Sequence, residues 1–272
     1  MNIEVIYLHV LAKSSKDAKD PSFYEKYNHR FAKTYAAHPA GVNHNLRVVF
    51  CGRRGTDADR LPYAGLSNVI FDCYTGTGWD LGAHQQVSSG LKCDLAYCLA
   101  TPVHFREDNW LTPIADAFER YGDGLYGPMA SNENMPHIRT SAFAFTPSTM
   151  RAYPHLVNSR ERCFNFESGF TAWGTMLNKG ETSFTNWMMD RGLPVLMVTR
   201  DRCYTKLNWR GPKNIFRRGD QSNCLVWDRH CDIYESSQPD AKRTLEYLAD
   251  YGKKLDGKTF EQPKEVEFMM GM

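Results

Sequence analysis

The chain lacks the features of several broad protein classes. It has no stretch of about 20 uncharged apolar residues, so no segment is expected to span a membrane. Its 8 cysteines form no CxxC pair, which favours reduced thiols over a disulfide framework or a zinc site. It contains no internal repeat and no low-complexity segment. The formal net charge is only +2, so bulk electrostatics does not indicate a nucleic-acid-binding protein, and a polyanion site requires a local patch.

The first ten residues also lack a basic segment. They carry Glu4 within an apolar run, which predicts a first strand at 3–10 rather than a signal peptide. Together with the reduced cysteines, this leads us to expect a cytoplasmic protein. With 272 residues the chain can bury a sizeable core, and one large domain is as consistent with this length as two small ones.

Apolar runs alternate with amphipathic ones along the chain. Strands are expected at 3–10, 46–51, 69–71, 93–99, 125–128, 141–145 and 194–198. Helices are expected at 21–37, 83–89, 108–121, 168–177, 181–191 and 240–251, with a short one from Thr146 and a polar, disordered tail at 252–272. Strands that alternate with helices predict an α/β fold whose mostly parallel sheet is flanked by helices.

The segment 69–99 is the most informative part of the chain. A strand at 69–71 leads into a glycine-bearing loop at 74–83, followed by a short helix and a second strand. In open α/β sheets, ligands bind beyond the carboxyl ends of such strands. Glycines there allow the backbone to approach a ligand closely, and Asp80 is the one charged residue of the loop. We therefore expect the substrate at this loop.

The same segment carries a family resemblance. The strand, the loop Gly78-Trp79-Asp80-Leu81-Gly82-Ala83, the helix and the strand 94–99 resemble the nucleotide-sugar half of GT-A-fold glycosyltransferases. The pattern is most similar to family-2-like and rhamnan-synthesis-type enzymes. Gly127-Pro128, His137-Ile138-Arg139-Thr140 and Phe166-Glu167-Ser168-Gly169 resemble the acceptor-side segments of these enzymes.

The resemblance covers residues 1–235 and implies a domain organisation. It implies a Rossmann-like GT-A catalytic domain at 1–235, with a donor half at about 1–105 and a loop-rich acceptor half at about 106–235. Residues 236–272 then form a C-terminal helix and a polar tail. The implied substrates are a nucleotide-diphosphate sugar donor and an acceptor hydroxyl.

One departure from the family pattern concerns the metal. Where these enzymes carry Asp-x-Asp, this chain has Leu99-Ala100-Thr101-Pro102-Val103, which offers no carboxylate to a divalent cation. Three alternatives follow: the enzyme works without metal, Glu107 and Asp108 supply the ligands, or the fold is kept and the chemistry is lost. Thr101, which lies in this segment, is a candidate nucleotide-binding residue.

Two acids are candidate catalytic residues. Glu167 opens a predicted helix at the place where the resemblance puts the catalytic acid, and Phe164 and Phe166 would desolvate it and raise its pKa. Alternatively, Glu167 is an ordinary first-turn acid that interacts favourably with the helix dipole. If Glu167 activates the acceptor for direct displacement, the reaction inverts the anomeric centre. Asp220 is the second candidate, for acceptor or donor binding.

Donor-binding candidates lie around two loops. In the first, Gly78, Trp79 and Asp80 would contact the nucleotide or sugar, although Asp80 could equally cap the helix that follows. In the second, His137 and Arg139 precede a buried strand, and an arginine would suit diphosphate oxygens in the absence of a metal motif. A solvated loop pair is the alternative for the second.

Residues 200–218 form the richest charge feature. Seven cations are interleaved with Tyr204, Trp209 and Phe216, and only Asp201 opposes them: Arg200, Arg202, Lys206, Arg210, Lys213, Arg217 and Arg218. We interpret this segment as a flexible loop that closes over the donor phosphates, with Trp209, Arg210, Arg217 and Arg218 as donor-binding residues. A solvated basic loop is the alternative.

Further along the chain, Asp228, His230 and Asp232 alternate. They would share one face of a strand, which makes His230 a candidate metal ligand; the favoured alternative is a polar strand edge with a capping Asp.

The sequence thus predicts a glycosyltransferase, with a glycan or a hydroxymethylated base in phage-type DNA as acceptor. One alternative is a nucleotide- or sugar-binding protein without turnover, favoured by the missing Asp-x-Asp. Another is a nucleotidyltransferase, but that class carries a glycine-rich signature after its first strand, and 11–20 contains no glycine.

The assignment of the base is testable by substitution. Glu167→Gln removes the proton acceptor at nearly constant shape, so transfer should be abolished while nucleotide binding survives. Turnover and nucleotide affinity measured on the same preparation check this. A Glu167→Gln protein that retains activity would remove Glu167 from the role of base.

Overall fold

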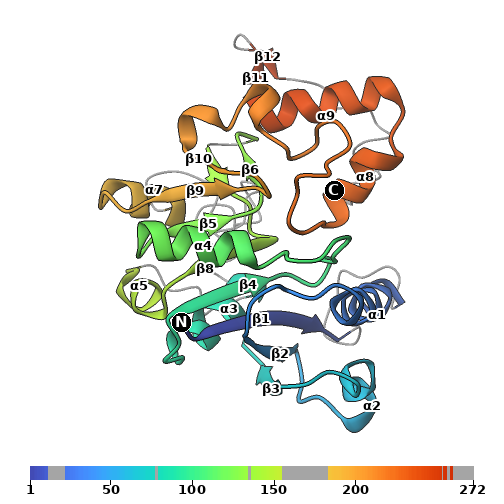
Figure 1. Cartoon of the computed structure of the whole chain (residues 1–272). Helices are drawn as coiled ribbons and strands as arrows, with labels where there is room; N and C mark the ends of the chain where they lie inside the picture. Colours follow the sequence, from blue (N-terminus) through green and yellow to red (C-terminus); the bar gives the residue numbers. More distant parts are fainter. Residues whose placement is uncertain are drawn as a thin grey trace.

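The chain folds around one large sheet with helices on both faces (Figure 1). The computed structural model describes residues 1–11, 22–76, 79–133, 136–154, 183–252, 254–255 and 258–259. The sheet has the strand order β10-β9-β5-β8-β4-β1-β2-β3. Only β8 and β10 run antiparallel to their neighbours in it. The predicted α/β class with a mostly parallel sheet is therefore confirmed.

The strands of this sheet follow the apolar runs of the sequence. They are β1 (Ile3–Val10), β2 (Asn45–Cys51), β3 (Val69–Tyr74), β4 (Leu95–Leu99), β5 (Leu125–Gly127), β8 (Ala142–Phe145), β9 (Val195–Val198) and β10 (Cys203–Tyr204). Two small antiparallel sheets add β6 (Ala130–Ser131) with β7 (His137–Ile138), and β11 (Lys254–Leu255) with β12 (Lys258–Thr259). The strands β11 and β12 correct the expectation of a wholly irregular tail.

Most of the helices lie where the sequence predicted them, with different ends, but those at 57–60 and 229–236 were not predicted. They are α1 (Ser22–Ala37), α2 (Asp57–Arg60), α3 (Trp79–Ser89), α4 (Thr112–Tyr121), α5 (Pro147–Ala152), α7 (Phe184–Asp190), α8 (Arg229–Ser236) and α9 (Pro239–Tyr251). Three short 3-10 turns are η2 (Leu61–Tyr63), η4 (Lys206–Asn208) and η5 (Gly211–Lys213). The helix expected at 168–177 lies outside the described residues.

Two hydrophobic layers hold the helices to the sheet. On one face, α1 and α4 contribute Phe31 and Ile114 to a core with alternate strand residues such as Val5 and Tyr97. On the other face, α3, α5 and α7 contribute their own apolar side chains to a second core, which includes Ile6. β1 is buried on both faces, as its nearly continuous apolar run requires.

The predicted strand around 228–232 is wrong. Asp228 is the N-cap of α8, and its carboxylate accepts hydrogen bonds from the backbone N–H groups of His230 (2.8 Å) and Cys231 (3.0 Å). The capping bonds start a helix directly after Asp228, so alternate residues no longer share a face. Residues 228, 230 and 232 therefore do not form the expected metal set.

The C-terminal helices pack closely on the rest of the chain. The expected boundary between 235 and 236 falls within α8, which ends at Ser236. In α9, Leu248 and Ala249 are fully buried, and the Ala249 carbonyl accepts a hydrogen bond from the Asn132 N–H at 2.7 Å. None of the helices that the structure describes is long and apolar enough to cross a membrane.

Trp110 is a residue of the core on the α4 face of the sheet whose loss should strongly lower stability. Its ring is fully buried, stacks on Phe105 at 4.1 Å, and donates a hydrogen bond to the His38 carbonyl at 2.9 Å. Trp110→Ala should lower the free energy of unfolding by about 3–5 kcal/mol in denaturant titration, because it leaves a cavity and an unpaired carbonyl. Leu61→Ala, at a side chain that is 69% exposed, should change it by less than about 0.5 kcal/mol.

Candidate functional site

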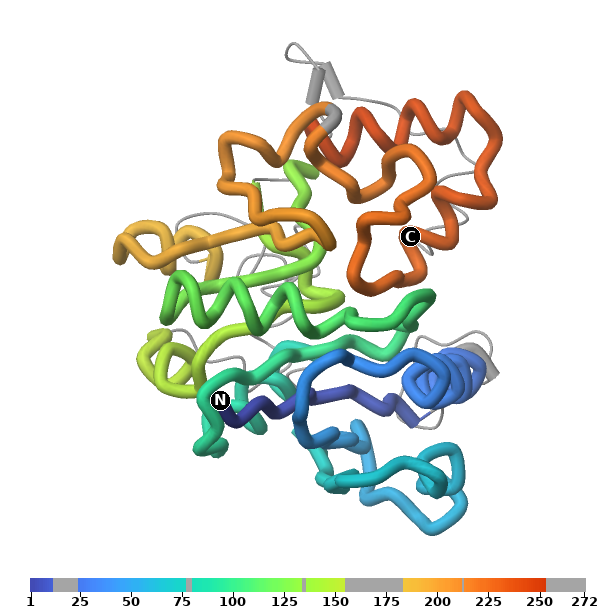
Figure 2. Tube along the Cα trace, viewed as in Figure 1, coloured from blue at the N-terminus to red at the C-terminus, as the bar shows by residue number. Residues whose placement is uncertain are grey.

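The carboxyl ends of the parallel strands meet at one edge of the sheet, where α1 and α8 also lie (Figure 1). These two helices are far apart in the sequence, and Figure 2 shows the C-terminal part of the chain returning close to α1. An ion pair joins them, with Arg30 Nη1 2.6 Å from Asp232 Oδ2. Ligands of open α/β folds bind at this edge.

A cluster of ionisable side chains is buried or half-buried at this edge. It consists of Glu133, Arg139, Arg217, Asp228 and His230, and is called the arginine cluster below. It adjoins the sheet through Ser141, which hydrogen-bonds Asp228 and precedes β8. The backbone carbonyl of Ser141 accepts a bond from the Ala100 N–H, directly after β4.

The two arginines share an aromatic neighbour. The guanidinium carbons of Arg139 and Arg217 lie 4.7 Å and 4.9 Å from the ring centre of Phe216. The side chain of Arg217 is only 1% exposed and that of Arg139 12%. The ring is buried and attracts both cations, and thus it helps to hold two like charges near one another.

The carboxylates of the cluster balance these charges without filling the arginine donors. Glu133 Oε2 lies 3.8 Å from Arg139 Nη1 and 3.7 Å from Arg217 Nη1. Asp228 Oδ2 lies 3.9 Å from Arg139 Nη2. Among the described residues, the Nε groups of both arginines and Nη1 of Arg217 have no hydrogen-bond partner. Buried donors of this kind favour an incoming anion with several oxygens.

The titrating groups keep this balance at neutral pH. Burial, with Arg139 and Arg217, lowers the pKa of His230, so the ring is neutral. Its Nδ1 lies 3.1 Å from Arg217 Nη2, which donates to it. Burial raises the pKa of Asp228, but Arg139 and the hydrogen bond from Ser141 together hold it below its usual value. The cluster therefore contains two cations and two carboxylates.

A cavity of about 260 Å³ opens at the carboxyl ends of β1 and β2. It is lined by His9, Asn28, Arg53 and Asp59, among others. Burial lowers the pKa of His9 to about 4, so its imidazole is neutral at pH 7. The guanidinium of Arg53 binds the Asp59 carboxylate through two hydrogen bonds of 2.7 and 3.1 Å. The cavity thus presents polar groups and little net charge.

The cavity and the arginine cluster are neighbours. Asn28 lines the cavity, and the residue before it in α1, Tyr27, has a raised pKa because of burial and the nearby Asp232 and Asp228 carboxylates. In the sheet, only β4 separates β1 from β8. At a strand spacing of about 4.8 Å, their ends lie roughly 10 Å apart.

The cavity was not identified from the sequence. Its residues come from β1, α1 and the segment after β2, and only the fold brings them together. The one local signal is Gly52-Arg53-Arg54-Gly55, a glycine and arginine turn at the carboxyl end of a strand.

Asp80 lies where the sequence predicted, at the start of the helix after β3. The helix begins at Trp79, so Asp80 is in its first turn rather than at its cap. Burial raises the pKa of Asp80 to about 6, and its charge contributes to the raised pKa of Cys51 at the end of β2. Gly78 and the side chain of Trp79 lie outside the described residues, as does Glu167.

Several other candidates stabilise the fold. Thr101 Oγ1 donates to the Leu8 carbonyl at 2.8 Å and ties the end of β4 to β1. His137 is buried in β7. Arg218 binds Asp250 at 2.5 Å, and Arg210 is exposed with its guanidinium 5.8 Å from the Tyr251 ring. The structure does not test whether these four residues bind a ligand, so their binding roles stay predictions.

Two expectations about the segment 200–218 are corrected. Trp209 is fully buried and donates a hydrogen bond to the Tyr204 carbonyl at 3.0 Å, so its ring is not open for stacking on a ligand. Phe216 and Arg217 are buried as well, so this part of the segment packs against the fold instead of forming an open loop. Asp220 is on an exposed turn, where it accepts hydrogen bonds from Ser222.

The described residues contain no group of three or more His, Cys, Asp or Glu side chains arranged to hold a metal ion. Glu107 pairs with Arg200 at 3.1 Å, and Asp108 with His38 at 3.1 Å. The described donor set therefore does not fit the divalent cation that the family resemblance implies.

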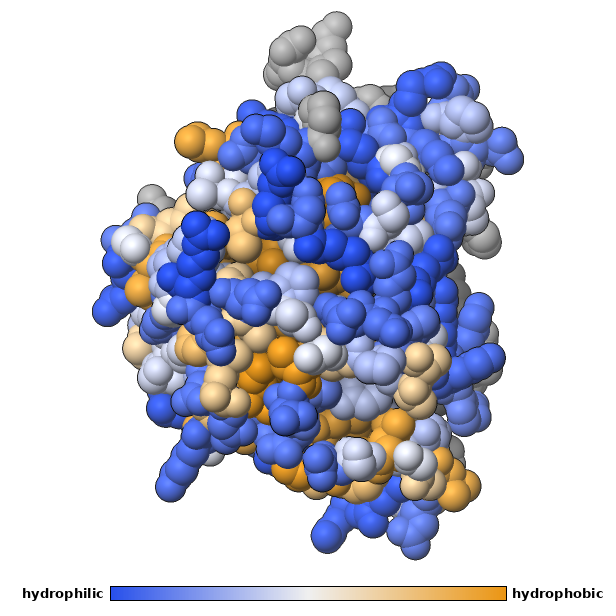
Figure 3. All heavy atoms as spheres, in the orientation of Figure 1, coloured by the Kyte–Doolittle hydropathy of each residue, from blue (hydrophilic) through white to orange (hydrophobic). Residues whose placement is uncertain are grey.

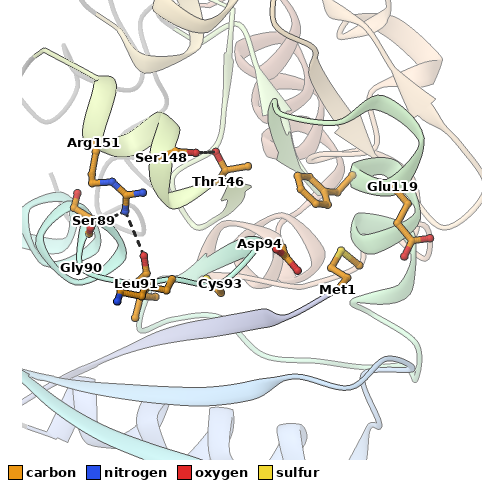
Figure 4. Close-up of a pocket in the computed structure, with 12 residues that line it drawn as sticks. Met1, Ser89, Gly90, Leu91, Cys93, Asp94, Glu119, Thr146, Ser148 and Arg151 are labelled. Carbon is orange, nitrogen blue, oxygen red and sulfur yellow. Dashed lines mark hydrogen bonds between the residues drawn. The ribbon is translucent and has the colours of Figure 1, made fainter.

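A larger cavity lies at the opposite edge of the sheet. It measures about 750 Å³ and is lined by Met1, Asp94, Thr146 and Arg151, among others (Figure 4). Its polar groups mostly bind one another: Arg151 Nη1 donates to the Ser89 and Leu91 carbonyls at 2.9 and 3.3 Å, and Asp94 accepts from the Asn2 N–H at 2.6 Å. We do not take this cavity as the candidate site, because it lies away from the carboxyl edge, where ligands of open α/β folds bind.

Comparison with known proteins gives a likeness to solved structures alone. No protein-family model and no curated protein sequence matches the chain. The galactosyltransferase LgtC with donor and acceptor sugar analogues has 14% identity and a TM-score of 0.43 over 89% of this chain and 99% of that chain. HddC from Yersinia pseudotuberculosis has 15% identity and a TM-score of 0.37 over 62% of this chain and 86% of that chain.

A third similar structure is S. aureus TarS in complex with UDP-GlcNAc, at 9% identity and a TM-score of 0.40 over 56% of this chain and 47% of that chain. The match to an active-site mutant of LgtC also spans only 59% of that chain. At these identities and TM-scores the likeness says nothing about chemistry. The resemblance to family-2-like and rhamnan-synthesis-type enzymes stays a prediction.

The raised pKa of Asp80 gives a stability prediction. An acid whose folded pKa is about 6 against an ordinary 3.8 destabilises the fold as pH rises through this window. The shift corresponds to about 3 kcal/mol, of which the helix dipole offsets at most about 1 kcal/mol. Asp80→Asn should therefore raise the free energy of unfolding by about 2 kcal/mol at pH 7 and change it little at pH 4. Urea titrations at both pH values measure this, and equal effects at the two would refute it.

Proposed function

We propose that the chain is a glycosyltransferase that moves a sugar from a nucleotide-diphosphate donor to an acceptor hydroxyl. The observation that carries the proposal is the arginine cluster at the carboxyl edge of the sheet, where two largely buried cations have N–H donors without a partner among the described residues. Glycosyl transfer from such a donor releases a diphosphate, and preorganised cations stabilise the charge that develops on it.

The arginines suit this leaving group better than a single cation would. A guanidinium binds phosphate oxygens through two parallel N–H bonds. Arg139 and Arg217, from segments far apart in the sequence, both present such donors. In the described residues no acidic set replaces the missing Asp-x-Asp. The proposed charge stabilisation therefore comes from the protein, and no step is assigned to a metal.

The cavity at β1 and β2 supports a place for the nucleoside. Its neutral His9 and the amide of Asn28 offer hydrogen-bond partners for a base or ribose, although Asn28 Nδ2 also donates to the Val10 carbonyl at 3.0 Å. Asp80, with its pKa of about 6, would accept a hydrogen bond from a ribose or sugar hydroxyl at neutral pH.

The acceptor side remains the part proposed from sequence. Glu167 is the proposed base, with inversion as the consequence of direct displacement, and a glycan hydroxyl is the proposed acceptor. Binding without turnover is the second candidate, favoured by the same missing Asp-x-Asp. Donor hydrolysis without any acceptor separates the two, since a binding protein would leave the donor intact.

A thermal-shift panel of nucleotide-diphosphate sugars, with and without manganese, tests the proposal directly. A donor that binds the folded chain raises its Tm by mass action, and a gain from manganese would reveal a metal site. No shift with any donor would contradict the proposal.

The arginine cluster gives the sharper prediction. Arg139→Gln should lower the rate of donor turnover about 10²–10³-fold, because one charged donor is lost where negative charge develops. Steady-state kinetics with the donor found in the thermal-shift panel measures this. Arg200→Gln, at an arginine that pairs with Glu107 outside the cluster, is the matched control and should keep normal turnover. Equal rates in both variants would exclude the cluster from catalysis.

A further inference from the structure

One loop of the molecule places an apolar side chain among cations at the surface. It comprises residues 202–213, from β10 to η5, and is called the cationic loop below. Leu207 in this loop is 93% exposed, more than any other large hydrophobic side chain in the described part of the chain. The loop contains no acidic residue. Its exposed cations are Arg202, Lys206, Arg210 and Lys213.

The exposure of Leu207 is imposed by the packing of the loop. Trp209, two residues away, is fully buried, and its carbonyl accepts hydrogen bonds from Asn132 Nδ2 at 2.8 Å and Asn214 Nδ2 at 3.2 Å. The Gly211 N–H donates to Asp250 Oδ2 at 2.9 Å. With one end of the loop anchored in this way, η4 turns its leucine outward.

The charges of the cationic loop are largely uncompensated. Asp201 pairs with Arg202 at 3.0 Å, but Lys213 Nζ donates to the neutral amide of Asn208, also at 3.0 Å. No ion pair within 4.0 Å involves Lys206, Arg210 or Lys213 among the described residues. Tyr251, 53% exposed, lies beside Arg210. Figure 3 shows hydrophilic side chains over this part of the face, with a hydrophobic projection near β10.

We propose that the cationic loop docks the protein on an anionic lipid bilayer. Leu207 enters the apolar boundary of the bilayer, and Lys206, Arg210 and Lys213 contact lipid phosphates. An exposed aliphatic side chain gains free energy only in an apolar environment, and cations beside it complement the negative surface of such a bilayer. Tyr251 fits the headgroup level, where tyrosine is enriched in membrane proteins.

The same features favour a bilayer over a nucleic acid. Sequence-independent strand binding combines cations with aromatic rings that stack on bases. Here Trp209, the largest ring of the loop, is buried, and the most exposed apolar group is a leucine. The test of this docking is separate from that of the proposed glycosyl transfer, because Leu207, Lys206 and Lys213 are neither in the arginine cluster nor among the predicted donor-binding residues.

Co-sedimentation of the full chain with vesicles tests the docking. The protein should bind vesicles of equimolar phosphatidylcholine and phosphatidylglycerol and not vesicles of phosphatidylcholine alone. Leu207→Ser should weaken binding about tenfold, because the leucine side chain no longer enters the bilayer. Replacing both Lys206 and Lys213 by Glu should weaken it at least about 25-fold, at about fivefold for each cation.

Matched variants outside the loop serve as controls. Leu61→Ser alters another strongly exposed leucine, and Lys33→Glu another exposed lysine, so both should bind as the unchanged chain does. Circular dichroism confirms that each variant is folded. Absence of sedimentation with the anionic vesicles, or equal binding by the Leu207→Ser and Leu61→Ser proteins, would overturn the proposal. Tighter binding to a DNA duplex than to the vesicles, unaffected by Leu207→Ser, would overturn it in favour of a nucleic-acid surface.

Discussion

The burial of Arg217 constrains the whole carboxyl edge of the sheet. A guanidinium that is 1% exposed is strongly destabilising unless carboxylates balance its charge. The balance comes from separate parts of the chain: Glu133 follows β6, and Asp228 caps α8. A second cation, Arg139, follows β7 and shares both carboxylates at distances of 3.8 and 3.9 Å. These separate segments therefore pack around charges that require each other.

This arrangement is balanced in charge but incomplete in hydrogen bonds. Ion pairs of 3.7 to 3.9 Å neutralise the arginines while leaving N–H groups without close acceptors in the described part of the cluster. An arrangement selected for stability alone would close these distances, since unpaired buried donors are costly. Asp80 is a second feature that selection for stability alone does not explain. Burial raises its pKa to about 6, which lowers the stability of the fold at neutral pH. Both features lie at the edge where ligands of such folds bind.

Local patterns in the sequence were sufficient for much of the sheet. The apolar runs at 3–10, 46–51 and 95–99 form β1, β2 and β4, because strands buried on both faces need nearly continuous hydrophobicity. The same approach failed at Asp228, where an alternating polar pattern concealed a helix cap. Capping depends on one side chain meeting two backbone N–H groups, which periodicity does not detect.

The candidate site was predictable only in part, for a related reason. Arg139 and Arg217 were identified singly, each from its place in a loop, but their shared contact with Phe216 spans long stretches of chain. His9 and Asn28 gave no signal, because they lie within an ordinary strand and an ordinary helix, and the only signal at Arg53 is the glycine and arginine turn after β2.

In the segment 200–218, the fold separates residues that the composition alone groups together. Its mixture of basic and aromatic residues suggested a single binding surface, yet packing divides these residues into a buried set and an exposed set. Trp209, Phe216 and Arg217 point inward, where the aromatic rings join the hydrophobic cores and the arginine joins the cluster. Lys206, Leu207 and Arg210 are exposed. Because no ion pair joins these exposed residues to the arginine cluster among the described residues, a change to them should leave the cluster intact, and the surface and the buried cluster can then be varied independently.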